Sequence, residues 1–240
     1  MKTQLIVALD VDSFKKAKRF VDKLYPRVRI FKVGSQLFTA SGPKAVAYIR
    51  KKGADVFLDL KFYDIPNTVA QSVRQAVRLG VRMLTVHITG GLKMLKAAVK
   101  AAREEALCLK QKKPLLIGVT ILTSHKASRK NVLKLAKIGL DCGLDGVVCS
   151  AQEAPLLREK IKKTFVIVTP GIRSDRALGD DQKRTATARE AIQAGSDFLV
   201  VGRPLLKSQE PLKVAKELLE SCGKLRHPIM RRSRMSDYND

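Results

Sequence analysis

The chain has 240 residues, of which 45% are hydrophobic and 29% charged, so we expect a folded globular protein with a sizeable core rather than a disordered or fibrous one. Lys and Arg outnumber Asp and Glu by 47 to 22, and the net charge of +25 attracts phosphorylated molecules and other anions. This charge is spread along the chain, Trp is absent and no helix-turn-helix or RNP-like string occurs. We therefore expect no dedicated nucleic-acid partner.

No apolar run approaches the roughly 20 residues that a membrane-spanning helix needs, and residues 1–3 lead straight into a strand-like segment instead of a signal-peptide apolar region. The sequence therefore predicts a cytoplasmic protein with no membrane partner. The cysteines form no C-x-x-C pair, which favours reduced thiols over a disulfide framework or a zinc site. They are Cys108, Cys142, Cys149 and Cys222.

Eight short runs rich in Val, Ile and Leu recur along the chain, and each is nearly continuous in apolar character. This pattern is typical of parallel strands that are covered on both faces. In chain order the predicted strands are Leu5–Asp10, Arg29–Gly34, Val56–Lys61, Met83–Ile88, Leu115–Thr120, Gly146–Ser150, Phe165–Pro170 and Phe198–Arg203.

Amphipathic stretches with helix signals separate these runs. Start signals are residues 41–43 (Ser-Gly-Pro), a first-turn proline at Pro66, and two capping-box patterns, Ser150 with Glu153 and Thr187 with Glu190. A glycine ends several of the stretches just before the next strand, as a left-handed helix stop does. These glycines are Gly53, Gly80, Gly143 and Gly195.

Eight strand–helix units in 240 residues average about 30 residues each, which predicts an α/β protein folded as a single (β/α)8 TIM barrel of parallel strands. A doubly wound open sheet is the alternative, but neither G-x-G-x-x-G after the first strand nor G-x-x-x-x-G-K-[ST] occurs. We expect the barrel domain to span residues 1–220. Residues 221–240 form a basic C-terminal tail that we expect to be poorly ordered, and we assign no function to it.

Polar residues close most of the predicted strands, and in such a barrel the functional site lies at the carboxyl ends of the strands. The sharpest group is Asp59, Lys61 and Asp64. Asp59 and Lys61 are two apart on a strand and should share one side, with Asp64 in the loop beyond. A lysine among carboxylates keeps its proton and gives it up only to a strongly basic partner such as a carbanion. A purely structural ion pair would show the same pattern.

The loops after the seventh and eighth predicted strands each combine a glycine with an arginine: Gly171 with Arg173, and Gly202 with Arg203. Such loops often form an anion site in barrels of this kind, because glycine amides and guanidinium groups both donate to phosphate oxygens. Either loop alone could be a bare turn. Together they favour a phosphorylated small molecule as the substrate.

Seven segments that include these strand ends resemble, in order, segments of the orotidine 5'-phosphate decarboxylase family. They are residues 7–10, 31–34, 57–68 (FLDLKFYDIPNT), 119–124, 169–173, 180–184 and 201–204. The resemblance covers nearly the whole predicted barrel. It implies a cofactor-free loss of CO2 from carbon 6 of the orotate ring, which gives uridine 5'-monophosphate in de novo pyrimidine synthesis.

The resemblance also implies catalytic roles. Lys61 would stabilise and protonate the vinyl carbanion, and Asp59 would lie beside the departing carboxylate, where it either strains the ground state or holds Lys61. Lys32 and Asp10 would bind ribose hydroxyls or brace the charges. Asp64, which completes the catalytic group, would reach into a neighbouring subunit's site.

Further contacts follow from the same resemblance. Thr68 would join Asp64 in the neighbour's site, so the active unit is expected to be a homodimer with composite sites. Thr123 and Ser124 would contact the pyrimidine. The phosphate would be bound by Gln182, Gly202 and Arg203, with Arg173 nearby. The segment 173–182 is a candidate lid over the substrate, although an ordinary surface loop would fit there too.

Two alternatives remain. A magnesium-dependent branch with the same barrel and the same D-x-K-x-x-D, similar to keto-gulonate phosphate decarboxylase and hexulose phosphate synthase, places a Glu where this chain has Lys32. A lysine there repels magnesium, so no metal is expected. The other alternative is a non-catalytic binding barrel. His87, at the end of the fourth predicted strand, is expected to be a core or rim histidine rather than a catalyst.

Overall fold

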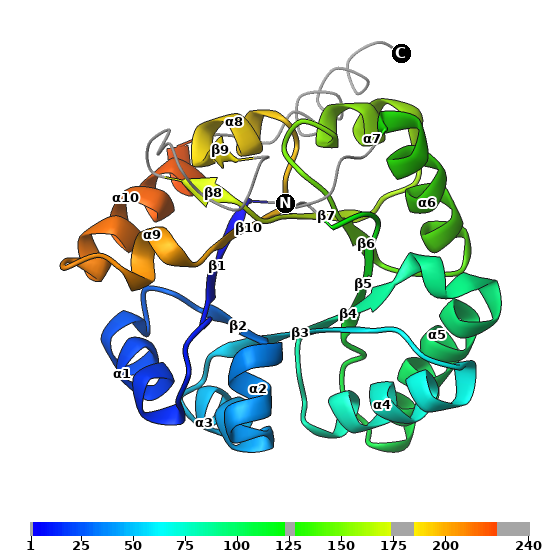
Figure 1. Cartoon of the computed structure of the whole chain (residues 1–240), viewed down its shortest axis with the longest axis horizontal. Coiled ribbons are helices and arrows are strands. Elements are labelled where there is room, and N and C mark those ends of the chain that lie inside the picture. The colour runs from blue at the N-terminus through cyan, green and yellow to red at the C-terminus, as the bar shows by residue number, and fades with distance from the viewer. Residues whose placement is uncertain (1, 123–127, 174–184, 225–240) are drawn as a thin grey trace, which may run out of the picture.

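A computed structural model describes residues 2–122, 128–173 and 185–224 of the chain. Eight parallel strands form a closed barrel in the order β1-β10-β7-β6-β5-β4-β3-β2 (Figure 1). Their bounds are β1 Gln4–Ala8, β2 Ile30–Gly34, β3 Asp55–Phe62, β4 Met83–His87, β5 Leu115–Val119, β6 Gly146–Val148, β7 Val166–Thr169 and β10 Phe198–Val201. Because β1 pairs with both β2 and β10, the sheet is closed. The predicted TIM barrel is confirmed, and the open-sheet alternative is wrong.

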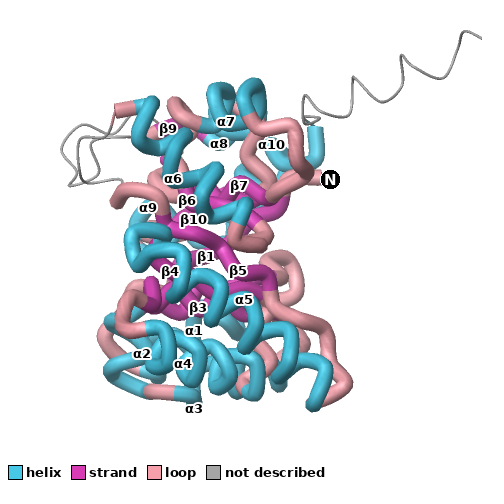
Figure 2. Tube along the Cα trace, turned by 90° about the vertical axis from the view of Figure 1, so that its right-hand side faces the viewer, coloured by secondary structure: helices cyan, strands magenta, loops and turns pink. Residues whose placement is uncertain are grey.

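Helices follow the strands and cover the outside of the barrel, which runs through the middle of the molecule (Figure 2). Their bounds are α1 Phe14–Leu24, α2 Ser35–Ser41, α3 Pro43–Lys51, α4 Pro66–Arg78, the 3-10 turn η1 Ile88–Gly90, α5 Gly91–Cys108, α6 Arg129–Asp141, α7 Ala154–Lys160, α8 Ala188–Gln193, α9 Arg203–Leu206 and α10 Pro211–Lys224. The last helix runs past the expected domain boundary at residue 220. The rest of the predicted tail, from residue 225, lies outside the described residues.

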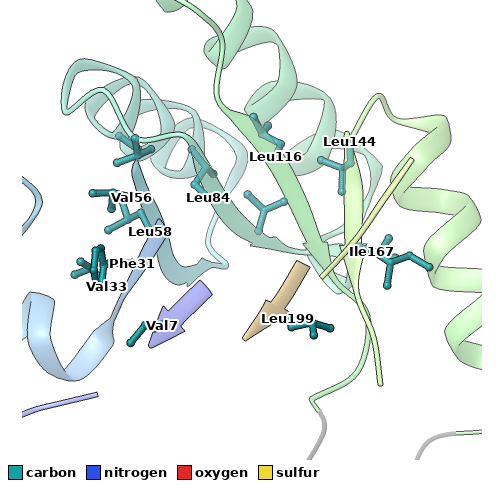
Figure 3. Close-up of a cluster of buried hydrophobic side chains, with 14 of the residues drawn as sticks. Val7, Phe31, Val33, Val56, Leu58, Leu84, Leu116, Leu144, Ile167 and Leu199 are labelled. Atoms are coloured by element: carbon teal, nitrogen blue, oxygen red, sulfur yellow. The ribbon is translucent and has the colours of Figure 1, made fainter. Parts of the chain in front are cut away.

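Side chains along each strand point alternately into two apolar layers, one inside the barrel and one outside it. One face of each strand fills the barrel interior, where Ile6, Phe57 and Phe198 pack together. The other face packs against the helices, through residues such as Val7 and Leu58 (Figure 3). Each fully buried aliphatic or aromatic side chain contributes about 1.5–3 kcal/mol. Burial on both faces explains why the strands read as continuous apolar runs.

The predicted helix stops are confirmed, since φ is positive at Gly53, Gly80, Gly143 and Gly195. The two capping-box predictions differ in outcome. Thr187 and Glu190 form the complete reciprocal box at the start of α8.

At the other pattern, only half of the box forms. The Glu153 carboxylate accepts from the Ser150 backbone N–H at 2.9 Å, but the buried Ser150 hydroxyl has no hydrogen-bond partner in the described structure. Residues 151–153 form a turn, and α7 begins only at Ala154. The Glu153 amide donates to the Ser150 carbonyl at 3.1 Å instead of to its hydroxyl. A full capping box at Ser150 is therefore a wrong prediction.

A small parallel sheet, β8 Ile172–Arg173 with β9 Ala186–Thr187, was not predicted. Two-residue strands are too short to show any periodicity. This sheet joins the segment after β7 to the start of α8 (Figure 1), and Arg173 pairs with Thr187 in it.

Candidate active site

A cavity of about 540 Å³ opens at the carboxyl ends of the barrel strands. Most of the predicted site residues line it: Asp10, Lys32, Asp59, Lys61, Gly171, Arg173, Gly202 and Arg203. Apolar side chains from the barrel interior, including Phe57, Val148 and Val200, complete the lining. The cavity has the size of a small-molecule site and combines an apolar wall with a few charged groups.

Four charged side chains of alternating sign form a continuous array on one side of this cavity. The Lys32 ammonium is 2.9 Å from Asp10 Oδ1 and 3.3 Å from Asp59 Oδ2. The Lys61 ammonium is 2.9 Å from the same Asp59 oxygen. Asp10 follows β1, Lys32 lies on β2, and Asp59 and Lys61 lie on β3. The predicted pairing of Asp59 with Lys61 is confirmed.

Lys32 and Asp59 stay ionised despite burial. Burial alone would lower the pKa of Lys32, but the charges of Asp59 and Asp10 outweigh it and raise this pKa above its ordinary value. Burial would likewise raise the pKa of Asp59, which is 8% exposed, but the two neighbouring ammonium groups hold that pKa below its ordinary value. A fixed carboxylate therefore lies between two fixed cations.

Thr85 on β4 supports the array, and sequence reasoning missed it. Lys61 has a left-handed backbone with φ of 51°, next to a register shift between β3 and β4. Its N–H donates to Thr85 Oγ1 at 2.9 Å, and the Thr85 hydroxyl donates to Asp59 Oδ1 at 3.0 Å. Lys61 thus reaches Asp59 from a bulged backbone, not by simple strand alternation. Thr85 lies in an apolar strand, where a threonine carries no functional signal.

Gly34, at the end of β2, is a second residue whose role the sequence did not reveal. A Cβ at this position would lie 3.0 Å from Lys32 Nζ and 3.3 Å from Asp10 Oδ1. The absence of a side chain therefore leaves room for the Lys32–Asp10 ion pair. Gly34 lies within the predicted segment 31–34. The need for a glycine there comes from the side chains of Lys32 on β2 and Asp10 after β1, which the sequence pattern does not show.

Two arginines that line the cavity come from two different loops, which follow β7 and β10. Arg173, on β8, is only 7% exposed, and burial lowers the pKa of its guanidinium. Its Nη1 donates to the Ile172 carbonyl at 3.3 Å. Arg203 begins α9 directly after Gly202, and both line the cavity with Gly171. The two predicted phosphate loops are thus brought together at the cavity that holds the charge array, and Gly202 lies next to Asp10, because a Cβ at Gly202 would be 3.5 Å from Asp10 Oδ2.

Asp64 and Thr68 are not brought into this cavity. Both are exposed, at the loop after β3 and in the first turn of α4. Asp64 Oδ1 accepts from the Ile65 N–H at 2.6 Å. Beside them, Tyr63 and Ile65 are 62% and 66% exposed.

The remaining predicted residues divide into two groups. Thr123, Ser124 and Gln182, together with most of the candidate lid 173–182, lie outside the described residues.

His87 ends β4, and its ring packs edge-on against Tyr63 at 5.6 Å between centroids. Burial and the nearby Lys61 charge lower the pKa of His87, so the imidazole is neutral at pH 7.

The described part of the chain contains no group of three or more His, Cys, Asp or Glu side chains placed to bind a metal ion. None of its helices is long and apolar enough to cross a membrane.

The fold and the cavity define a class: a (β/α)8-barrel protein whose cavity is lined by two arginines and by lysines held among carboxylates. Within this class, residues 3–218 match the model of the orotidine 5'-phosphate decarboxylase / HUMPS family, and the chain belongs to that family.

Individual relatives agree with this assignment. Orotidine 5'-phosphate decarboxylase of Syntrophotalea carbinolica is 47% identical over 92% of this chain and 96% of its own. The enzyme of the same name from Coxiella burnetii is 47% identical over 88% of this chain and 92% of its own. Among solved structures, the orotidine 5'-phosphate decarboxylase of Lactobacillus acidophilus superposes with a TM-score of 0.81 at 33% identity and covers 92% of this chain and 99% of its own.

Proposed function

We propose that this protein is a decarboxylase that removes CO2 from carbon 6 of orotidine 5'-phosphate and forms uridine 5'-monophosphate, the last step of de novo pyrimidine synthesis. The observation that carries the proposal is the array Asp10–Lys32–Asp59–Lys61 in one cavity with Arg173 and Arg203, in a member of this family. The array suits a charged reacting centre, and the two guanidinium groups suit a phosphate.

The reaction needs only groups of the chain itself. The bond between carbon 6 and the carboxylate breaks, the electron pair stays on carbon 6, and CO2 leaves. The Lys61 ammonium stabilises this carbanion and then transfers its proton to carbon 6. Asp59 orients Lys61 through the 2.9 Å ion pair and lies beside the departing carboxylate. Because these charges are already in place before the substrate binds, little reorganisation is needed in the transition state.

The other contacts follow the family pattern. Lys32 and Asp10 bind ribose hydroxyls and brace the array. Gly202, Arg203 and Arg173 bind the phosphate with Gln182, and Thr123 and Ser124 contact the pyrimidine. Binding energy from the phosphate, which does not react, lowers the barrier at carbon 6.

We further propose a homodimer in which Asp64 and Thr68 of each subunit complete the other subunit's site. In one chain both residues are exposed and lie outside the cavity. The exposed Tyr63 and Ile65 beside them supply the apolar surface that a subunit interface needs.

The free cysteine thiols support the proposed cytoplasmic location. All four cysteines are free, and three of them are buried. Burial raises the pKa of Cys222 to about 11, so this thiol stays protonated and unreactive. Such thiols suit a reducing compartment.

The chemistry of the array argues against the magnesium-dependent alternative. The Lys32 ammonium occupies the space between Asp10 and Asp59, 2.9 and 3.3 Å from their oxygens. A divalent cation at these carboxylates would have to displace that ammonium or accept its repulsion.

Turnover in the presence of excess EDTA tests the proposed function. We expect purified protein to consume orotidine 5'-phosphate, followed by its absorbance, and Lys61→Ala to lower kcat by at least about 1,000-fold, because both charge stabilisation and proton transfer are lost. The matched control Lys216→Ala removes one positive charge from the exposed face of α10 and should keep wild-type turnover.

Two outcomes would contradict the proposal. Activity that is absent in EDTA but returns with magnesium and a sugar phosphate would place the chain in the metal-dependent branch. No turnover under either condition would favour a binding barrel.

A further inference from the structure

A second cavity, of about 640 Å³, lies on the outside of the barrel next to the first one. It is formed between α1 and the segment that runs from α9 to the first residue of α10, elements that lie side by side in Figure 1. We call it the α1–α9 groove and define it by Arg19, Phe20 and Lys23 on α1 and by Leu206, Lys207 and Pro211 on the facing segment. Neither the proposed reaction nor the family pattern uses these residues.

Uncompensated positive charge distinguishes the groove. Arg19, Lys23 and Lys207 are exposed, and their side chains form no hydrogen bond or ion pair with any described residue. The carboxylates that line the groove already have partners, because Asp12 pairs with Lys16 at 2.7 Å and Asp10 pairs with Lys32. Three free cations around one concavity raise the local concentration of a multiply charged anion.

The groove also has an apolar floor. Phe20 and Leu206 are half-buried and Pro211 is buried, so apolar surface lies directly between the cations. The volume is well above what a single phosphate group fills, and it lies within the range of sites for small organic ligands. The lining thus fits a ligand that joins several phosphate charges to a ring system.

We propose that the α1–α9 groove binds a nucleoside polyphosphate at a site separate from the substrate cavity. The triphosphate contacts Arg19, Lys23 and Lys207, and the nucleoside packs on Phe20, Leu206 and Pro211. The triphosphate would bridge the two sides of the groove, because Arg19 and Lys23 lie on α1 and Lys207 lies on the facing segment.

The groove adjoins the substrate cavity, since Asp10 and Arg203 line both. A polyphosphate in the groove therefore competes for the Arg203 guanidinium and weakens substrate binding. This consequence rests on the proposed function, whereas the binding itself does not. The expected effect is a higher KM for orotidine 5'-phosphate with little change in kcat.

Calorimetric titration with ATP, on the full chain at 0.15 M salt without magnesium, tests the binding directly and requires no turnover. We expect Arg19→Ala/Lys23→Ala to weaken ATP binding at least about tenfold, the loss of one or two charge-assisted contacts. Lys15→Ala/Lys18→Ala is the matched control, because it removes the same charge from exposed positions of the same helix that do not line the groove. It should change the affinity less than about twofold.

Three results would overturn the proposal. The first is no ATP binding to the wild-type chain at millimolar concentration, and the second is an unchanged affinity in Arg19→Ala/Lys23→Ala. The third is equal weakening of ATP binding in both double variants, which would indicate general attraction by the +25 charge. Inorganic tripolyphosphate provides a further arm. It should bind more weakly than ATP, and equal affinity would contradict the role of the apolar floor.

Turnover supplies an independent readout. Without ATP, both double variants should have the wild-type kcat and KM, because neither changes a residue of the substrate cavity. With ATP, the KM for orotidine 5'-phosphate should rise in the wild-type chain and in Lys15→Ala/Lys18→Ala but not in Arg19→Ala/Lys23→Ala. A protein that binds ATP as expected but shows no turnover would refute the proposed function and leave the groove in place.

Discussion

At the scale of single residues, the position of Lys61 depends on a hydroxyl group that lies outside the cavity lining. A left-handed backbone costs about 1–2 kcal/mol at a residue with a side chain. Thr85 offsets this cost at Lys61 by accepting its N–H, and the same hydroxyl donates to Asp59. One fully buried oxygen therefore links the backbone of the proposed acid to the carboxylate that orients it.

Thr85→Val removes this oxygen with almost no change in shape. We expect kcat to fall about 10- to 100-fold with KM within about threefold, because the ammonium loses its alignment while the phosphate contacts remain. Thr85→Ser keeps the hydroxyl and should restore most of kcat. Steady-state kinetics on the folded variants measures this difference, and wild-type kcat in Thr85→Val would show that Thr85 does not position Lys61.

At the scale of secondary-structure elements, the same four-residue pattern produces two different helix starts. At α8, Thr187 and Glu190 satisfy each other's backbone amides. Before α7, the chain makes a turn over residues 151–153, so the Ser150 hydroxyl is buried and unpartnered within the described structure. The four-residue pattern alone therefore does not determine whether the capping box is completed.

This contrast predicts different effects of two similar substitutions on the free energy of unfolding. Thr187→Ala removes a cap and should lower the free energy of unfolding by about 1 kcal/mol. Ser150→Ala removes a hydroxyl without a partner and should leave that free energy unchanged or raise it, because burial of an unsatisfied polar group is unfavourable. Urea denaturation of both variants makes the comparison. A larger loss in Ser150→Ala than in Thr187→Ala would be inconsistent with the observed caps.

At the scale of the whole molecule, one barrel brings together the charge array and the phosphate loops but leaves Asp64 outside. This separation is what a composite site requires. The barrel also places the Lys32 ammonium on β2 within 3.3 Å of carboxylates that follow β1 and lie on β3, although these segments are widely separated in sequence.

Subunit mixing tests the proposed dimer. Lys61→Ala and Asp64→Asn should each be nearly inactive alone, but an equimolar mixture that exchanges subunits should recover about a quarter of wild-type turnover, since about half of the dimers are mixed and each has one intact site. Sedimentation before and after mixing verifies that dimers form. Recovery of no activity in a mixture that has demonstrably exchanged would rule out a site shared in this way.

The sequence by itself determined the barrel, its strand positions, the helix-stop glycines and the charged residues of the cavity. These features are readable because apolar periodicity, a glycine before a strand and the residues at strand ends are local patterns along the chain. The strand predicted at 56–61 appears as β3, for example, and the glycine at 195 has a φ of 101°. The resemblance to the family's segments, which are also short stretches of sequence, placed Lys32 and Lys61 in one site.

Only the tertiary structure decided the roles of Thr85 and Gly34, the incomplete cap at Ser150, the β8–β9 sheet and the α1–α9 groove. Apart from the cap at Ser150, each depends on atoms from segments that are distant in the sequence, and two-residue strands or a lone threonine carry no periodic signal of their own. Closure of the barrel brings these segments within hydrogen-bond distance, and neighbouring strands then determine which side chain has a partner.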